Sequence, residues 1–214
     1  MAEDQKDETL FNDVMLDIET LGTQPGCAVV SIGAVLFNRP NSYVGPTFSA
    51  NISIVDLIDN FGFSVSGGTI QWWLNQSSEA QAGLLEGSVN VVHALMDFAR
   101  FVTDDHDGGC DERVRVWGNG AGFDNVLVRQ MYERMRLQAP WKFWNDRCYR
   151  TLKNENDKAK ELLPTAAESN VAHRALDDAL WQTYHLLNMD AGYVKFDNIG
   201  VDGTAQMELE LKGG

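Results

Sequence analysis

Three apolar segments follow one another closely near the N-terminus, with only short turn-forming sequences between them. They are DVMLDIET (13–20), AVVSIGAVLFN (28–38) and PTFSANIS (46–53). Short runs rich in β-branched residues are typical of strands. Because the connections are short, and TQPG (23–26) has the composition of a turn, we predict a meander of adjacent strands. This start excludes an all-helical fold.

The rest of the chain alternates between segments of helical and strand character. The predicted helices cover 69–76, 78–87, 88–102 with Ser88 as N-cap, 123–135 and 171–189, and the predicted strands cover 114–120 and 141–147. Residues 152–170 are polar and turn-rich. This order predicts an α/β fold, a mixed five-stranded sheet flanked by helices, and it fits a ribonuclease H-like architecture. We expect one domain over 13–190, a flexible acidic leader at 1–12, and a tail at 191–214 whose structure the sequence does not indicate.

The charge balance limits the ways in which this chain could bind nucleic acid. It has 214 residues and a net charge of −14, which argues against a protein that coats nucleic acid by charge attraction. No apolar run is long enough for a membrane span, and the acidic N-terminus lacks the apolar core of a signal peptide. The 3 cysteines form no CxxC pair. We therefore expect a cytoplasmic protein, from a bacterial cell or a phage-infected host, that does not bind membranes.

Two carboxylates end the first predicted strand. Asp17 and Glu19 are separated by one residue, so their side chains point to the same face. The two carboxylates repel each other unless their charge is neutralised. A divalent cation, which prefers oxygen ligands, can neutralise it. Acidic residues are also common at strand ends without any metal, so the pair alone does not establish a site.

A second acid follows the fourth predicted strand. Asn119 and Asp124 bracket a turn that contains Gly120 and Gly122, and Asp124 begins the following helix. The turn would bring Asp124 beside the end of the first strand. Aspartate is also an ordinary helix cap, which is the alternative explanation.

A third signal lies at the start of the last predicted helix. His173 is followed by Asp178, and an imidazole titrates near neutrality, so it can act as a general base. A surface histidine at a helix start is the alternative. At about 100° per residue, Asp177 would lie closer to the face of His173 than Asp178 does, so helical geometry alone favours Asp177. If His173 lies before the regular helix begins, this constraint is relaxed.

Taken together, these three motifs resemble the DEDDh branch of the DEDD 3′→5′ exonucleases. Asp17–Thr20 matches its Asp-x-Glu-Thr motif, Asn119–Asp124 its second motif, and His173 with Asp178 its third. The resemblance chooses Asp178 over Asp177. Segments 69–77, 141–152 and 171–179 also resemble the ribonuclease T-like and phage exonuclease A-like group.

The resemblance implies a catalytic set and two Mg²⁺ or Mn²⁺ ions. By this resemblance, Asp17 would be the ligand that bridges the two ions. Glu19 and Asp178 would complete the coordination shell of one ion, and Asp124 would hold the second ion. His173 would take a proton from the attacking water. The product would be a nucleoside 5′-monophosphate.

Substrate contacts are expected around this set. Thr20 and Leu21 would meet the terminal nucleotide through a backbone amide and an apolar contact, as the resemblance implies. One of the adjacent Trp72 and Trp73 would be core and the other would stack on an unpaired base; we assign Trp73 to the substrate. The other expected contacts are Asn119, Arg147 and Arg174, although a solvated basic face would also explain the arginines.

We therefore expect a protein that acts on 3′ ends of single-stranded DNA or RNA. Two rivals are a ribonuclease H-like endonuclease or resolvase, and a catalytically inactive nucleic-acid binding module. The sequence leaves open the choice between RNA and DNA and the oligomeric state, a homodimer included.

Overall fold

A computed structural model describes residues 11–103, 110–164 and 174–191 of the chain. Its strands are β1 (Asp13–Thr20), β2 (Val29–Asn38), β3 (Tyr43–Asn51), β4 (Arg115–Gly118) and β5 (Asp146–Cys148). Its α-helices are α1 (Gly67–Leu74), α2 (Ser78–Gly83), α3 (Val91–Thr103), α4 (Asp124–Arg134), α5 (Tyr149–Glu155) and α6 (Ala175–Ala191). A π-helical turn covers Asp56–Asn60, and a 3-10 turn covers Phe143–Asn145.

The strands form one five-stranded mixed sheet in the order β3-β2-β1-β4-β5. The first three strands are antiparallel neighbours, whereas β4 is parallel to β1 and β5 is parallel to β4. The predicted meander and mixed sheet are therefore confirmed. The crossover from β3 to β4 places β4 beside β1, so the carboxyl ends of β1 and β4 lie at the same edge of the sheet.

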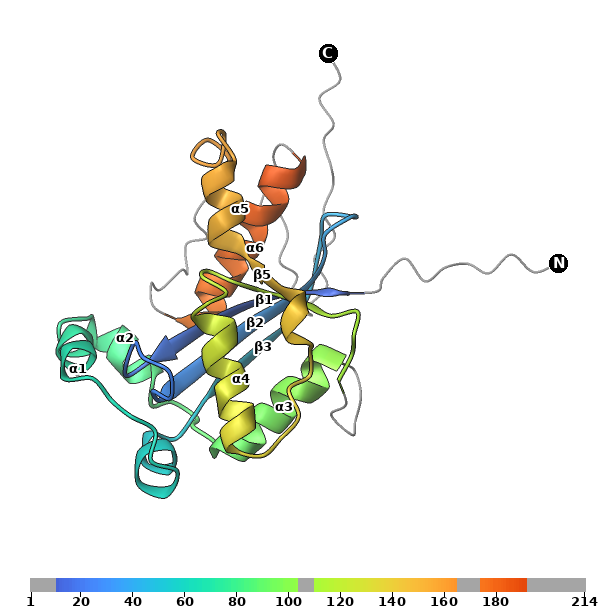
Figure 1. The fold of residues 1–214 in the computed structure, drawn as a ribbon. Coiled ribbons are helices and arrows are strands. Elements are labelled where there is room, and N and C mark those ends of the chain that lie inside the picture. The colour runs from blue at the N-terminus through green and yellow to red at the C-terminus, as the bar shows by residue number, and fades with distance from the viewer. Residues whose placement is uncertain (1–10, 104–109, 165–173, 192–214) are drawn as a thin grey trace, which may run out of the picture.

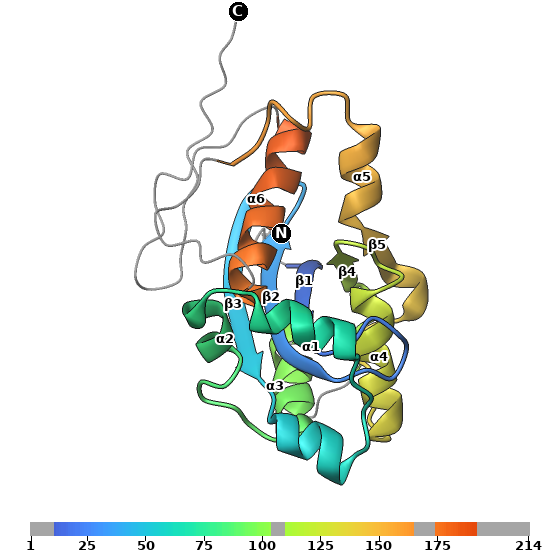
Figure 2. The same cartoon turned by 90° about the vertical axis from the view of Figure 1, so that its left-hand side faces the viewer.

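Helices cover both faces of the sheet, as the two views show (Figures 1 and 2). Along β1, Val14, Leu16 and Ile18 pack with α3 and α4 in the larger core. Met15 faces the other way and belongs to the smaller core, which α5 and α6 complete. Side chains alternate along a strand, so Asp17 and Glu19 share the face of Met15, beneath α6.

Several element boundaries differ from the prediction. Helix α3 begins at Val91, and its cap is Asn90, whose Oδ1 accepts a hydrogen bond of 2.9 Å from the backbone N–H of His93; Ser88 is not the cap. The segment predicted as strand 141–147 contributes only two of its residues to β5, because a 3-10 turn precedes that strand. A short helix, α5, begins before the segment expected to be only turns.

None of the helices in the described ranges combines the length and the apolar composition needed to cross a bilayer.

Candidate active site

The start of α6 lies directly over β2 because residue 33 is glycine. Asp17 pairs with Gly33 across the β1–β2 ladder, and Glu19 pairs with Ser31. A methyl group at Gly33 would lie 2.2 Å from the main-chain carbonyl carbon of Ala175, a contact that no side chain could accommodate. Glycine therefore lets the first turn of α6 approach the carboxylates of β1.

This approach brings three carboxylates together. Oxygen atoms of Asp17, Glu19 and Asp178 all lie within 4.8 Å of one another. Asp178 belongs to the first turn of α6, where its N–H donates to the carbonyl of Arg174 at 3.0 Å. Asp177 instead lines an adjoining cavity of about 200 Å³. The member of the pair that joins the cluster is therefore Asp178, the one that helical geometry alone did not favour.

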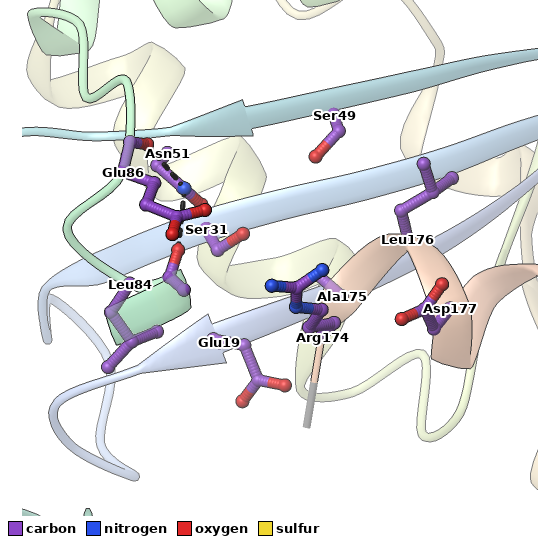
Figure 3. A pocket seen from close by; sticks show the side chains of 11 residues that line it. Glu19, Ser31, Ser49, Asn51, Leu84, Glu86, Arg174, Ala175, Leu176 and Asp177 are labelled. Atoms are coloured by element: carbon purple, nitrogen blue, oxygen red, sulfur yellow. Dashed lines mark hydrogen bonds between the residues drawn. The ribbon is translucent and has the colours of Figure 1, made fainter. Parts of the chain in front are cut away.

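The adjoining cavity opens beside Glu19, between the start of α6 and the loop after α2. Figure 3 shows Arg174 and Asp177 on the α6 side and Asn51 with Glu86 on the far side. The Nδ2 of Asn51 donates to the carbonyls of Gly83 and Glu86, each at 2.7 Å. These two hydrogen bonds fix the far wall of the cavity to β3.

Asp124 supplies a fourth carboxylate from the start of α4. The turn before it is tight, since the N–H groups of Phe123 and Asp124 both donate to the carbonyl of Gly120 at 2.6 and 3.2 Å. Asp124 is only 5% exposed, and its Oδ2 is buried without a hydrogen-bond partner among the described residues. A methyl group at Gly118 would lie 2.9 Å from that oxygen, so glycine also makes room here.

Burial and mutual repulsion disfavour the charged forms of these acids. Burial raises the pKa of Glu19 to about 8, with Asp178 and Asp124 adding repulsion. Burial likewise raises the pKa of Asp124 to about 7. The pKa of Asp17 is raised well above its ordinary value by burial and then by Asp124. Buried carboxylates that repel one another, one with an unpartnered oxygen, form a donor set that fits a divalent cation.

Gln182 holds the central acid of this group. Its Nε2 donates to Oδ1 of Asp17 at 2.8 Å, and its side chain is 4% exposed. This hydrogen bond lowers the pKa of Asp17 and so opposes the effect of burial. Sequence reasoning missed Gln182. The available signal was its position one helical turn after Asp178, on the same face of α6.

The residues after Glu19 are mostly buried. Thr20 is 9% and Leu21 4% exposed. The Oγ1 of Thr20 donates to the carbonyl of Gly22 at 2.7 Å, and the N–H of Leu21 donates to the carbonyl of Ala28 at 2.9 Å. The roles expected of Thr20 and Leu21 toward a nucleotide stay predictions.

The assignment of Trp73 to base stacking is wrong. Trp73 is 5% exposed, and its Nε1 donates to the carbonyl of Thr20 at 2.9 Å, so it supports the end of β1 from within the core. Trp72 is 42% exposed and packs its ring edge-on against that of Trp73. Adjacent side chains on a helix point about 100° apart, so the expectation that one of the two is core is correct, and that one is Trp73.

Two of the other expected contacts, Asn119 and Arg174, belong to segments next to the acidic residues. Asn119 precedes Gly120 in the turn before Asp124, and its carbonyl accepts from Nη2 of Arg150 at 2.5 Å. Arg174 lines the cavity beside Glu19. Arg147 folds back on its own chain, where its Nη1 donates to the carbonyls of Trp144 and Asp146 at 3.2 and 3.0 Å. His173 lies outside the described residues.

A family model described as "3'-5' exoribonuclease Rv2179c-like domain" matches residues 12–189. Among curated proteins, the chain is similar to the exodeoxyribonuclease of Enterobacteria phage T4. The two are 29% identical over 160 aligned positions, and the match covers 65% of this chain and 69% of the phage protein.

Solved structures of nucleases have a similar fold. The zinc-bound complex of E. coli ExoI with single-stranded DNA gives a TM-score of 0.53 at 17% identity, and the match covers 82% of this chain and 40% of that chain. The nuclease domain of 3'hExo, a DEDDh family member bound to rAMP, gives a TM-score of 0.53 at 11% identity, covering 94% of this chain and 98% of that domain. This chain therefore spans less than half of ExoI and almost the whole of the 3'hExo domain.

Proposed function

We propose a reaction for this chain, which belongs to the family of 3'-5' exoribonuclease Rv2179c-like domains. It hydrolyses single-stranded nucleic acid from the 3′ end and releases nucleoside 5′-monophosphates. The family match confirms the predicted resemblance to 3′→5′ exonucleases, and the chain shares its fold with the DEDDh nuclease domain of 3'hExo. The activity of the family is 3′→5′ exonucleolytic. The substrate form, the ions and the residue roles are our proposals.

One observation carries the proposal: three carboxylates converge within 4.8 Å at the end of β1, and Asp124 repels two of them, Asp17 and Glu19. A purely structural cluster of this kind would destabilise the fold, because each acid is buried or partly buried beside like charges. We assign these four acids to hold two Mg²⁺ or Mn²⁺ ions. Asp17 would be the central ligand of the set, Glu19 and Asp178 would serve one ion, and Asp124 would serve the other. When bound, such ions activate water and stabilise the leaving oxygen.

The protein residues then position the strand and move one proton. We assign His173 to accept the proton of the attacking water. The bond that breaks joins the phosphorus of the terminal nucleotide to O3′ of the nucleotide before it, and that O3′ leaves and takes up a proton from solvent. Glu19 and the Thr20–Leu21 segment would contact the terminal nucleotide and its 3′-hydroxyl. Gln182 would keep the carboxylate of Asp17 in one orientation through its hydrogen bond to Oδ1.

Three features favour a single-stranded substrate. A chain with a net charge of −14 lacks the broad positive field that grips a duplex along its length. The half-exposed Trp72 offers an aromatic face to an unpaired base. ExoI, which has a similar fold, is solved as a complex with single-stranded DNA. Because the family is described as exoribonucleases and the phage relative as an exodeoxyribonuclease, both RNA and DNA belong in the test.

The test uses RNA and DNA strands of one sequence, labelled at the 5′ end and incubated with Mn²⁺. We expect a ladder of labelled fragments that shorten from the free 3′ end, and resistance of the same strands with a 3′-phosphate. Cleavage of a circular single strand would favour the rival endonuclease. Binding without any release of nucleotides would favour the rival inactive module.

A further inference from the structure

Two aromatic side chains stand out from the surface just before β5. Phe143 is 66% exposed and Trp144 57% exposed. Their rings pack edge to face with centroids 5.0 Å apart. An exposed pair of large aromatic residues contributes little to the core, and such patches mark contact surfaces.

The pair is held rigidly by the residues on either side. Trp141 is buried, and its Nε1 donates to Oδ1 of Asp146 at 2.8 Å. The Nδ2 of Asn145 donates to the carbonyl of Glu112 at 2.7 Å. The 3-10 turn between these anchors therefore presents Phe143 and Trp144 in fixed positions, and a preordered surface loses less entropy when it binds a partner.

Positive charge surrounds the aromatic rings. Lys142 places its Nζ 5.9 Å from the ring centroid of Trp144, and Arg147 donates to the carbonyl of Trp144 at 3.2 Å. Of the nearby acids, Asp111 is paired with Arg113 and Asp146 with Arg129, whereas Glu112 is exposed next to Asn145 and offsets part of this positive charge. In a chain with a net charge of −14, aromatic faces flanked by cations favour an unpaired nucleic-acid strand, whose bases stack while its phosphates meet the cations.

Strand β5 connects this surface to the acidic cluster. It ends at Cys148, which pairs with Gly118, the last residue of β4 before the turn to Asp124. Trp144 lies in the 3-10 turn before β5, so the path from Trp144 to Cys148 is at most roughly 13 Å, at about 3.3 Å per extended residue. That length corresponds to about four stacked nucleotides at 3.4 Å each.

We propose that Lys142, Phe143, Trp144 and Arg147, here called the aromatic surface, bind unpaired nucleotides on the 5′ side of the substrate's 3′ end. The inference rests on the proposed function, because it takes the 3′ terminus to lie at the acidic cluster. It adds a second contact, several nucleotides from the reacting bond, that makes affinity depend on strand length.

The test measures affinity rather than cleavage. Binding of 5′-fluorescein oligothymidylates of about 3 and about 12 nucleotides is followed by anisotropy with Mn²⁺, in an Asp124→Asn background that preserves the strand. Adding Phe143→Ala and Trp144→Ala should weaken binding of the long strand by roughly 5- to 150-fold, which is the effect of losing the stacking of about one base. The affinity for the short strand should not change. Val55→Ala, at a side chain that is 64% exposed elsewhere, is the matched control and should change neither affinity.

A second variant tests the charge. Lys142→Gln should reduce the salt dependence of binding of the long strand, by a slope of about 0.7 for each phosphate that the protein no longer neutralises. An equal decrease in affinity for both lengths, or none for either, would overturn the proposal. So would a change in sedimentation without a change in affinity, which would mark the surface as an interface between copies of the chain. The two proposals can fail separately. If the parent protein degrades no strand, but the alanine variants still abolish the length dependence of binding, the proposed function is refuted and this inference is supported.

Discussion

Replacing Glu19 with glutamine should stabilise the metal-free protein and abolish its activity. The pKa of Glu19 is raised from 4.5 to about 8 in the folded state, so the folded protein holds a proton that the unfolded chain releases above pH 4.5. A raised folded pKa means that this stabilising proton is fully present at low pH and is lost as pH rises toward 8. Glutamine has nearly the same shape and no charge to desolvate.

The gain follows from the linkage between pKa and stability. At about 1.36 kcal/mol per pKa unit, the full shift would penalise the parent by roughly 4 kcal/mol at pH 8 and by about 1 kcal/mol at pH 5. The amide of glutamine loses some hydrogen bonds with water when buried, which costs about 1–2 kcal/mol. The net gain for Glu19→Gln should therefore be about 2–3 kcal/mol at pH 8 and close to zero at pH 5.

Urea denaturation in a chelator, at both pH values, measures this difference. The control is Glu86→Gln, which removes an exposed acid from the same cavity and should change stability by less than about 0.5 kcal/mol at either pH. If Glu19→Gln is no more stable than the parent at pH 8, the carboxylates are not held under repulsion, and the electrostatic argument for the site is refuted.

The other predictions concern ions, the proton acceptor and the residue that holds Asp17. Chelator-stripped protein should melt at a higher temperature with millimolar Mn²⁺, because an ion that binds only the folded state stabilises it; an unchanged melting curve would contradict a metal site. His173→Ala should lower turnover strongly and flatten its pH dependence between about pH 6 and 8, where imidazole changes charge; parallel profiles would remove His173 from that role. Gln182→Leu should weaken Mn²⁺ affinity by roughly 10- to 100-fold, the usual effect of losing a residue that orients a ligand, while Gln182→Glu should alter its pH dependence; unchanged affinity in both would make Gln182 purely structural.

The fold and the acidic cluster were predictable because periodic patterns determine them. Alternation along β1 placed Asp17 and Glu19 on one face, and the strand order predicted the mixed sheet that the structure has. The choice of Asp178 came from the family resemblance and not from helical geometry. That geometry was reckoned from His173, which lies outside the described residues, whereas α6 begins at Ala175.

Other features depend on contacts between segments that are distant in sequence. Nothing local distinguishes Trp72 from Trp73; the burial of Trp73 follows from its hydrogen bond to Thr20, a residue from another element. The 141–147 segment shows strand-like aromatic content, yet Trp141 alone enters the core because its indole meets Asp146. Gln182 acquires a role only when α6 lies over β1.

Direct measurement of Mn²⁺ binding by calorimetry tests the central claim, that Asp17, Glu19, Asp124 and Asp178 together hold the ions. The parent should bind about two ions per chain, Asp178→Asn should lose at least one, and Asp177→Asn should match the parent, because Asp178 lies in the cluster and Asp177 in the adjoining cavity. Full binding by Asp178→Asn together with loss in Asp177→Asn would contradict the account.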